Sequence, residues 1–189
     1  MSFLDNPRNA GTAIFLVGII TMILGVVMIV LAVTSDEYDT VFGALSGVGA
    51  LISGFIYFGL GKDVRNGTIS DKWDILTRFV LCVAMVTIIQ SILGIGGTSG
   101  EQIGSAIIGV IIGLIIFFVY KKMTDGKATT VDKIIWILLV IIFIIEIILN
   151  IIALLAFPIG TLMGICGIII YCFMLITVLD NDVKAKMGM

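Results

Sequence analysis

One acidic residue, Glu146, lies deep within an apolar segment, and it is the residue of this chain best suited to chemistry. Asn150 follows it one helical turn later on the same face. An ionisable side chain at the centre of a bilayer costs about 3 kcal/mol on insertion scales, and such residues usually bind ions, protons or one another. No Lys or Arg occurs at that depth. We therefore expect the carboxyl group to be protonated or to bind a cation.

A second set of polar residues, Thr87, Gln90 and Ser91, recurs at spacings of three and four and therefore shares one face of a helix. Counted from the starts of their helices, Gln90 and Asn150 lie at similar depth. In one interpretation, this set and Asn150 help Glu146 to bind a proton or cation during transport. In the other, neutral Glu146 donates a hydrogen bond to Gln90 or to a backbone carbonyl and holds helices or protomers together.

Other kinds of chemistry are not expected from this composition. Histidine is absent, and the three cysteines show no Cys-x-x-Cys spacing, so we expect no metal site and no cofactor. The chain has no basic patch beyond short connectors, so a nucleic-acid partner is not expected either. An enzyme is the least expected class, because there is no His and no pair of acids at membrane depth.

Composition places the chain in the membrane. Of its 189 residues, 60% are apolar and 13% charged, against about half and a quarter in soluble domains. Apolar stretches near the roughly 20 residues that cross a bilayer core occur at 12–33, 41–61, 75–95, 103–120, 134–156 and 159–179. We predict an all-α integral membrane protein, a single domain over 1–189, with six transmembrane helices in three hairpins. The hairpins cover 12–61, 75–120 and 134–179, with tails at 1–11 and 180–189.

The positive charges are segregated along the sequence. All 11 Lys and Arg residues lie in the two tails or in and beside the second and fourth connectors, whereas the other three connectors contain none. Positively charged connectors remain on the cytoplasmic side of a membrane. We therefore expect a multi-pass protein of the cell membrane with both termini in the cytoplasm.

Two parts of the chain resemble each other. Residues 54–67 align without gaps with 113–126, and each stretch leaves an apolar segment, passes a basic residue and ends in Asn-Gly or Asp-Gly. A Thr-x-x-Asp sequence, which is typical of a helix N-terminus, follows at 68–71 and at 129–132. These matches predict an internal repeat of about 60 residues. The alternative is that membrane hairpins in general share such caps and basic flanks.

Small residues gather in the even-numbered apolar segments, often four residues apart. Such stripes allow two helices to approach closely in lipid. We expect the even segments to pack at the centre and the bulkier odd ones to lie outside or against partner subunits. The predicted packing positions are Gly43, Gly47, Gly54, Ser105, Gly109, Gly113, Gly160 and Gly164.

Two functions are compatible with these features. The first expectation is a structural or accessory membrane subunit that packs or oligomerises through its small-residue faces. Its partners would be the lipid bilayer and either a second copy or another membrane protein. The alternative is a channel or transporter for a small ion or solute that uses Glu146.

Overall fold

The fold consists of helices joined by short connectors. The computed structural model describes residues 3–34, 40–94, 100–156 and 161–189, and every regular element in this part of the chain is helical. The elements are η1 (Phe3–Asp5), α1 (Pro7–Thr34), α2 (Thr40–Arg65), α3 (Lys72–Gly94), α4 (Gly100–Met123), α5 (Thr130–Ala156), α6 (Thr161–Val178) and α7 (Asn181–Lys186). Within the described ranges, the five helices α1 to α5 are long and apolar enough to cross a membrane.

The predicted apolar segments all coincide with helices. Helices α1 to α5 continue for several residues past these segments at the ends that carry Lys and Arg, as α2 does from Gly61 to Arg65. Polar residues can remain helical there because their side chains reach water. The sixth predicted segment corresponds to α6, which is apolar but shorter than the other five.

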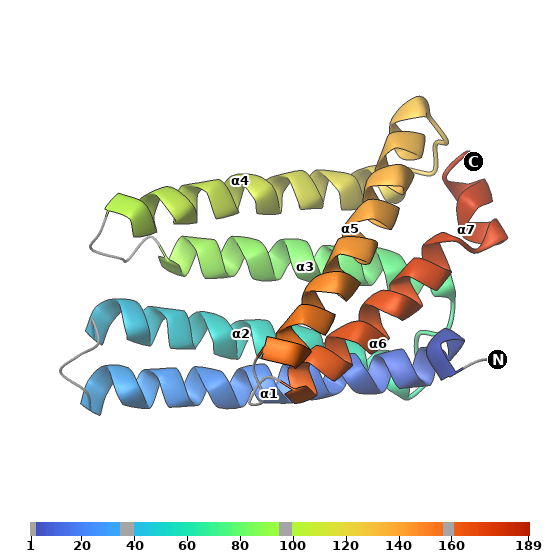
Figure 1. Ribbon diagram of the computed structural model, residues 1–189. Coiled ribbons are helices and arrows are strands. Elements are labelled where there is room, and N and C mark those ends of the chain that lie inside the picture. Colours follow the sequence, from blue (N-terminus) through green and yellow to red (C-terminus); the bar gives the residue numbers. More distant parts are fainter. Residues whose placement is uncertain (1–2, 35–39, 95–99, 157–160) are drawn as a thin grey trace.

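Helices α1 to α4 lie side by side and alternate in direction (Figure 1). Both termini and the connectors after α2 and α4 lie at the same end of this bundle. We call it the basic end, formed by residues 3–8, 62–72, 121–133 and 180–189. The segregation of positive charge in the sequence therefore corresponds to one end of the fold.

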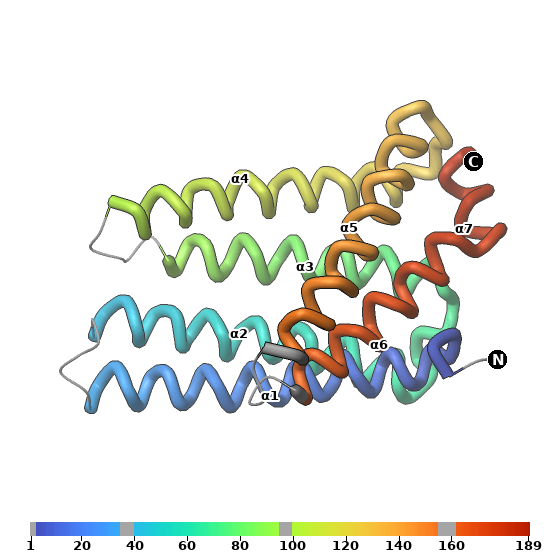
Figure 2. Tube along the Cα trace, in the orientation of Figure 1, coloured from blue at the N-terminus to red at the C-terminus, as the bar shows by residue number. Residues whose placement is uncertain are grey.

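Helices α5 and α6 pack against each other and run obliquely to the other four (Figures 1 and 2). Near its start, α6 contributes Met163 and Gly167 to a cavity that is also lined by Ile14 and Val17 of α1. Helix α1 continues from there to Thr34, over about 25 Å. The α5–α6 pair thus ends well short of the far end of α1. The six apolar segments, which are similar in length, had suggested helices that all extend equally far.

The most extensive interface joins α1 and α2. Glycines recur every seven residues on both helices, and this period returns to the same face of a helix. Because the helices are antiparallel, the glycines face one another in pairs: Gly11 with Gly61, Gly18 with Gly54, and Gly25 with Gly47. A Cβ atom on Gly18 would lie 2.8 Å from the Gly54 carbonyl oxygen, closer than van der Waals contact allows. The two backbones therefore touch directly.

The predicted packing positions lie mostly between helices of the same chain. Gly43, Gly47 and Gly54 face α1, Gly109 and Gly113 face α3, and Gly164 faces α5. Ser105 is exposed, and Gly160 lies outside the described residues. The expectation that even helices occupy the centre is wrong for α3 and α4. The most apolar window of α3 is 39% buried, and that of α4 is 11% buried, because α4 packs mainly on α3 alone.

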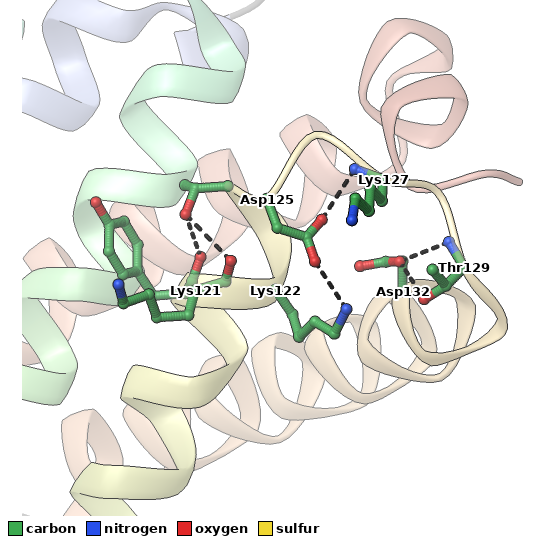
Figure 3. A network of polar contacts seen from close by, with 8 residues as sticks. Lys121, Lys122, Asp125, Lys127, Thr129 and Asp132 are labelled. Atoms are coloured by element: carbon green, nitrogen blue, oxygen red, sulfur yellow. Dashed lines mark hydrogen bonds and ion pairs between the residues drawn. The ribbon is translucent and has the colours of Figure 1, made fainter.

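The two Thr-x-x-Asp sequences cap their helices differently. At α5 the predicted cap is present, but with the Thr129 hydroxyl as a donor rather than as the acceptor of a backbone N–H: the backbone N–H and the hydroxyl of Thr129 donate to the Asp132 carboxylate at 2.7 and 2.6 Å (Figure 3). At α3 the prediction is wrong for the threonine, because Asp71 is the capping residue and accepts from the Asp74 backbone N–H at 3.2 Å. The turns before the caps do match. Gly67 and Gly126 have φ of 78° and 71°, a left-handed conformation that favours glycine.

Ion pairs at the basic end join segments that are distant in sequence. The Lys72 ammonium lies 2.7 Å from Asp5 and 3.0 Å from Asp180, and each of the three side chains is about a quarter exposed. The Trp136 indole N–H donates to the Val178 carbonyl at 2.8 Å. The N-terminal segment, the start of α3, the start of α5 and the end of α6 are thereby held together.

We expect Gly61→Ala to destabilise the protein by about 1–3 kcal/mol, because its Cβ would overlap the backbone of Phe15 on α1. Gly59→Ala is the matched control, since no neighbouring atom lies within 4 Å of its Cβ position. Thermal unfolding in detergent should give a lower midpoint for Gly61→Ala and no decrease for Gly59→Ala. Equal midpoints for the two variants would contradict direct backbone contact between α1 and α2.

We expect Lys72→Met to lower the unfolding free energy by about 1–2 kcal/mol, because it leaves two partly buried carboxylates without their cation. Lys122→Met is the control: Lys122, in the last turn of α4, pairs with Asp125 only three residues later, so its loss disconnects no distant segments. A thermal shift of the same size in both variants would contradict a joining role for Lys72.

The same ion pairs predict a pH dependence of stability. The hydrogen bond with Asp5 holds the pKa of Lys72 above its usual range, and the hydrogen bond from Lys72 holds the pKa of Asp180 below its usual range. Both contributions are therefore complete between about pH 4 and pH 10. The Asp180 contribution is lost as pH falls below that window, and the Lys72 contribution as pH rises above it. Unfolding midpoints measured across pH should decrease less steeply outside this window in Lys72→Met.

Candidate functional site

Glu146 lines a cavity of about 240 Å3 where five helices converge. Helices α1, α2 and α3 form one side of it, and α5 and α6 form the other. Its lining residues are Ile14, Val17, Tyr57, Phe79, Glu146, Asn150, Met163, Gly167, Ile170 and Tyr171. Apart from Glu146, none of these side chains carries a charge.

The cavity lies in the half of the bundle next to the basic end. Ile14, Tyr57 and Phe79 are each two turns from the helix terminus at that end, about 11 Å along their helices. Along α5 itself, Glu146 lies 16 residues from the helix start, about 24 Å. Because α5 runs obliquely, residues along α5 advance along the bundle more slowly than residues along α3, so Glu146 lies nearer the basic end than that count suggests (Figure 1).

Asn150 is positioned by its own helix and by a glycine of α6. Its Nδ2 donates to the backbone carbonyl of Glu146 at 2.8 Å. Its carboxamide occupies the space next to Gly167, where a Cβ atom would overlap it. Gly164 also lies close to α5, with its Cβ position 3.3 Å from the Asn150 carbonyl oxygen. These two glycines of α6 therefore make room for the polar face of α5.

The ring of Tyr171 lies between α3 and α5 next to Glu146. It lies 6.0 Å from that of Phe79 on α3, edge to face, and 6.1 Å from that of Phe143 on α5. Aromatic pairs at such distances hold rings in fixed orientations. Tyr171 thus packs between α3 and α5 and forms part of the cavity wall beside Glu146.

Three polar side chains of this cavity lack hydrogen-bond partners among the described residues. No described residue forms a hydrogen bond with the side chain of Glu146, and the same holds for the hydroxyl groups of Tyr57 and Tyr171. Polar groups in protein interiors are normally hydrogen-bonded to protein or to ordered water. The Glu146 carboxyl is therefore available to water, a proton or a ligand.

The structure does not bring the polar set of α3 to Glu146. Thr87, Gln90 and Ser91 line a different cavity of about 270 Å3 between α2, α3 and α4. Gln90 lies about 27 Å along α3 from the basic end, far beyond the level of Glu146. Its Nε2 donates to the buried Ser53 hydroxyl at 3.2 Å, which links α3 to α2.

Tyr57 and Tyr171 are the site residues that sequence reasoning missed. Tyrosine in a membrane helix usually lies at the interface with water, yet Tyr171 occurs eight residues from the nearer end of its apolar segment. That displacement was the available signal. The sequence could not indicate that these two tyrosines, more than a hundred residues apart, share one cavity with Glu146.

The site has the donors for a cation but not for a multi-acid metal centre. In the described part of the chain, no group of three or more His, Cys, Asp or Glu side chains could hold a metal ion. The cavity offers a carboxylate, an amide oxygen and phenol oxygens, all of them hard ligands.

Comparison of the chain with protein-family models, with curated proteins and with solved structures finds no match.

Proposed function

We propose that the protein is a membrane transporter or channel for a small cation or cationic solute that binds at Glu146. The observation that carries this proposal is an acidic side chain with no hydrogen-bond partner among the described residues, in a cavity between five helices. A carboxylate in a membrane protein is costly to hold without compensation. A proton or a cation supplies that compensation, and the oxygens of Asn150, Tyr57 and Tyr171 complete a polar environment around it.

The position of the cavity supports exchange with water. It lies about 11 Å from the basic end, so an ion that leaves Glu146 crosses a short distance to the connectors. The α5–α6 pair forms one wall and inclines against the other helices. A change in that inclination would alter the cavity without disturbing the α1–α2 interface.

The second candidate is the structural or accessory membrane subunit. Its supporting observation is the surface of α4 and α5, where bulky residues such as Ile108, Ile111, Ile141 and Ile145 are about half exposed. That surface suits lipid or another membrane protein. However, the described small-residue positions that were expected to join subunits pack mostly inside this chain. An assembly would therefore use the bulky surface instead.

We place the basic end in the cytoplasm and the protein in the cell membrane, as a multi-pass protein with both termini inside. The positive-inside rule and the clustering of Lys and Arg at one end of the fold support this orientation. Six crossings and an internal repeat of about 60 residues belong to the same proposal. They are supported by six apolar segments and by the matching glycine turns at 67 and 126.

The proposal is tested by cation flux into proteoliposomes. We expect Glu146→Gln to lower flux at least about tenfold, because it removes charged-group interactions of about 1.5–3 kcal/mol with the cation. Glu101→Gln is the matched control, since Glu101 is exposed at the opposite end of the bundle. Flux that is equal in the native protein and Glu146→Gln would contradict the proposal.

Labelling by a lipophilic carbodiimide, which attacks protonated carboxyl groups, gives an independent measurement. We expect Glu146 to react in the folded protein, and the rate to fall as pH or cation concentration rises. If Glu146 reacts only after unfolding, the carboxyl is a sealed packing contact. The accessory function would then be favoured.

A further inference from the structure

A second cavity meets the Glu146 cavity from the side. It has a volume of about 240 Å3, lies between α3, α4 and α5, and shares the residues Phe79, Glu146 and Tyr171 with the first. Glu146 therefore lines both spaces. The remaining lining residues are all aliphatic or aromatic, among them Ile115, Ile116, Val119, Leu138 and Ile142.

This apolar groove opens on the surface of the protein between α4 and α5. These two helices contact each other only sparsely in the described structure, so the space between them is not closed. The residues at its rim, Ile115, Leu138 and Ile142, are 57%, 47% and 47% exposed. In a membrane, an exposed aliphatic rim of this kind faces lipid chains. The groove thus leads from the lipid phase to the carboxyl group of Glu146.

We propose that the ligand of Glu146 is an amphiphilic cation, with an ammonium head and one alkyl chain, that reaches the site sideways from the bilayer. The proposal rests on the proposed function, because it specifies the class of ligand that the same acid binds. The chain would lie in the apolar groove, and the ammonium would pair with the Glu146 carboxylate. Among the residues that the structure describes, no Lys, Arg or second acid lines either cavity, so Glu146 alone sets the charge that is recognised.

The aromatic side chains around the acid suit such a head. The rings of Tyr171, Phe79 and Tyr57 line the inner cavity, and aromatic faces attract ammonium groups. A bare lipid chain could fill the groove but would leave the carboxylate without a partner, and a phosphate head would be repelled by it. Each cavity is smaller than the roughly 300 Å3 at the lower end of drug-sized pockets, which suits a ligand divided into head and chain.

The test measures protection of Glu146 from a lipophilic carbodiimide by two ammonium ions, dodecylammonium and methylammonium, in proteoliposomes. Ile116→Trp narrows the groove from α4, and Ile112→Trp is the matched control, exposed on the same helix outside the groove. We expect Ile116→Trp to weaken protection by dodecylammonium about tenfold, equivalent to ~1.4 kcal/mol. Protection by methylammonium, which reaches Glu146 from water, should change less than about twofold, and Ile112→Trp should change neither.

Three outcomes would contradict the proposed function, access through the groove or the amphiphilic ligand. If neither ammonium ion protects Glu146 in the native protein, the ammonium ligand is overturned, and the proposed function fails as well if Glu146→Gln leaves cation flux unchanged. If both protect but Ile116→Trp leaves dodecylammonium protection unchanged, access through the groove is overturned while the proposed function stands. If dodecanol protects as well as dodecylammonium, the groove holds an ordinary lipid chain and the proposal is overturned. Val119→Phe on the same wall replaces Ile116→Trp if that variant does not fold.

Discussion

The direct contact between the backbones of α1 and α2 is the constraint on which the rest of this structure depends. In lipid there is no hydrophobic force between helices, so close shape complementarity has to hold them together. Facing glycines at a spacing of seven provide it along most of both helices. The resulting pair offers two surfaces for further packing: α3 packs on α2, and α6 packs on α1.

The cavity follows from this arrangement. Because α1 and α2 are pressed together, their larger residues Ile14, Val17 and Tyr57 project from the contact toward α3 and α6. On the other side, Tyr171 of α6 packs its ring between Phe79 of α3 and Phe143 of α5. The space that remains is where α5 presents Glu146. An acid that would be expensive against lipid is thus placed among aromatic, amide and apolar side chains of five helices.

The oblique course of α5 and α6 is fixed at the basic end. Lys72 connects the start of α3 with Asp5 and Asp180, and Trp136 connects the start of α5 with the last residue of α6. The short helix α7 is capped by Asp180, whose side chain accepts from the Asp182 backbone N–H. These contacts hold the α5–α6 pair at one end, whereas the start of α6 lies against α1 near Ile14 and Val17.

The sequence by itself determined the helices and their membrane character, because apolar length and charge position are local properties. It also determined the cap at Thr129 and Asp132, since both partners lie within one turn. It identified Glu146 and Asn150, which are neighbours on one helix. It did not indicate which residues surround them. Gln90 was grouped with them because depth was counted along each helix as if all helices were parallel.

Only the tertiary structure decided which groups surround the acid and where the small residues pack. The inclination of α5 separates Glu146 from Gln90 and brings it to Tyr57 and Tyr171 instead. The period of seven in the glycines of α1 was present in the sequence, but its meaning depends on a partner helix running in the opposite direction. Contacts between distant segments depend on crossing angles, and those are set by the packing of the whole chain rather than by any single segment.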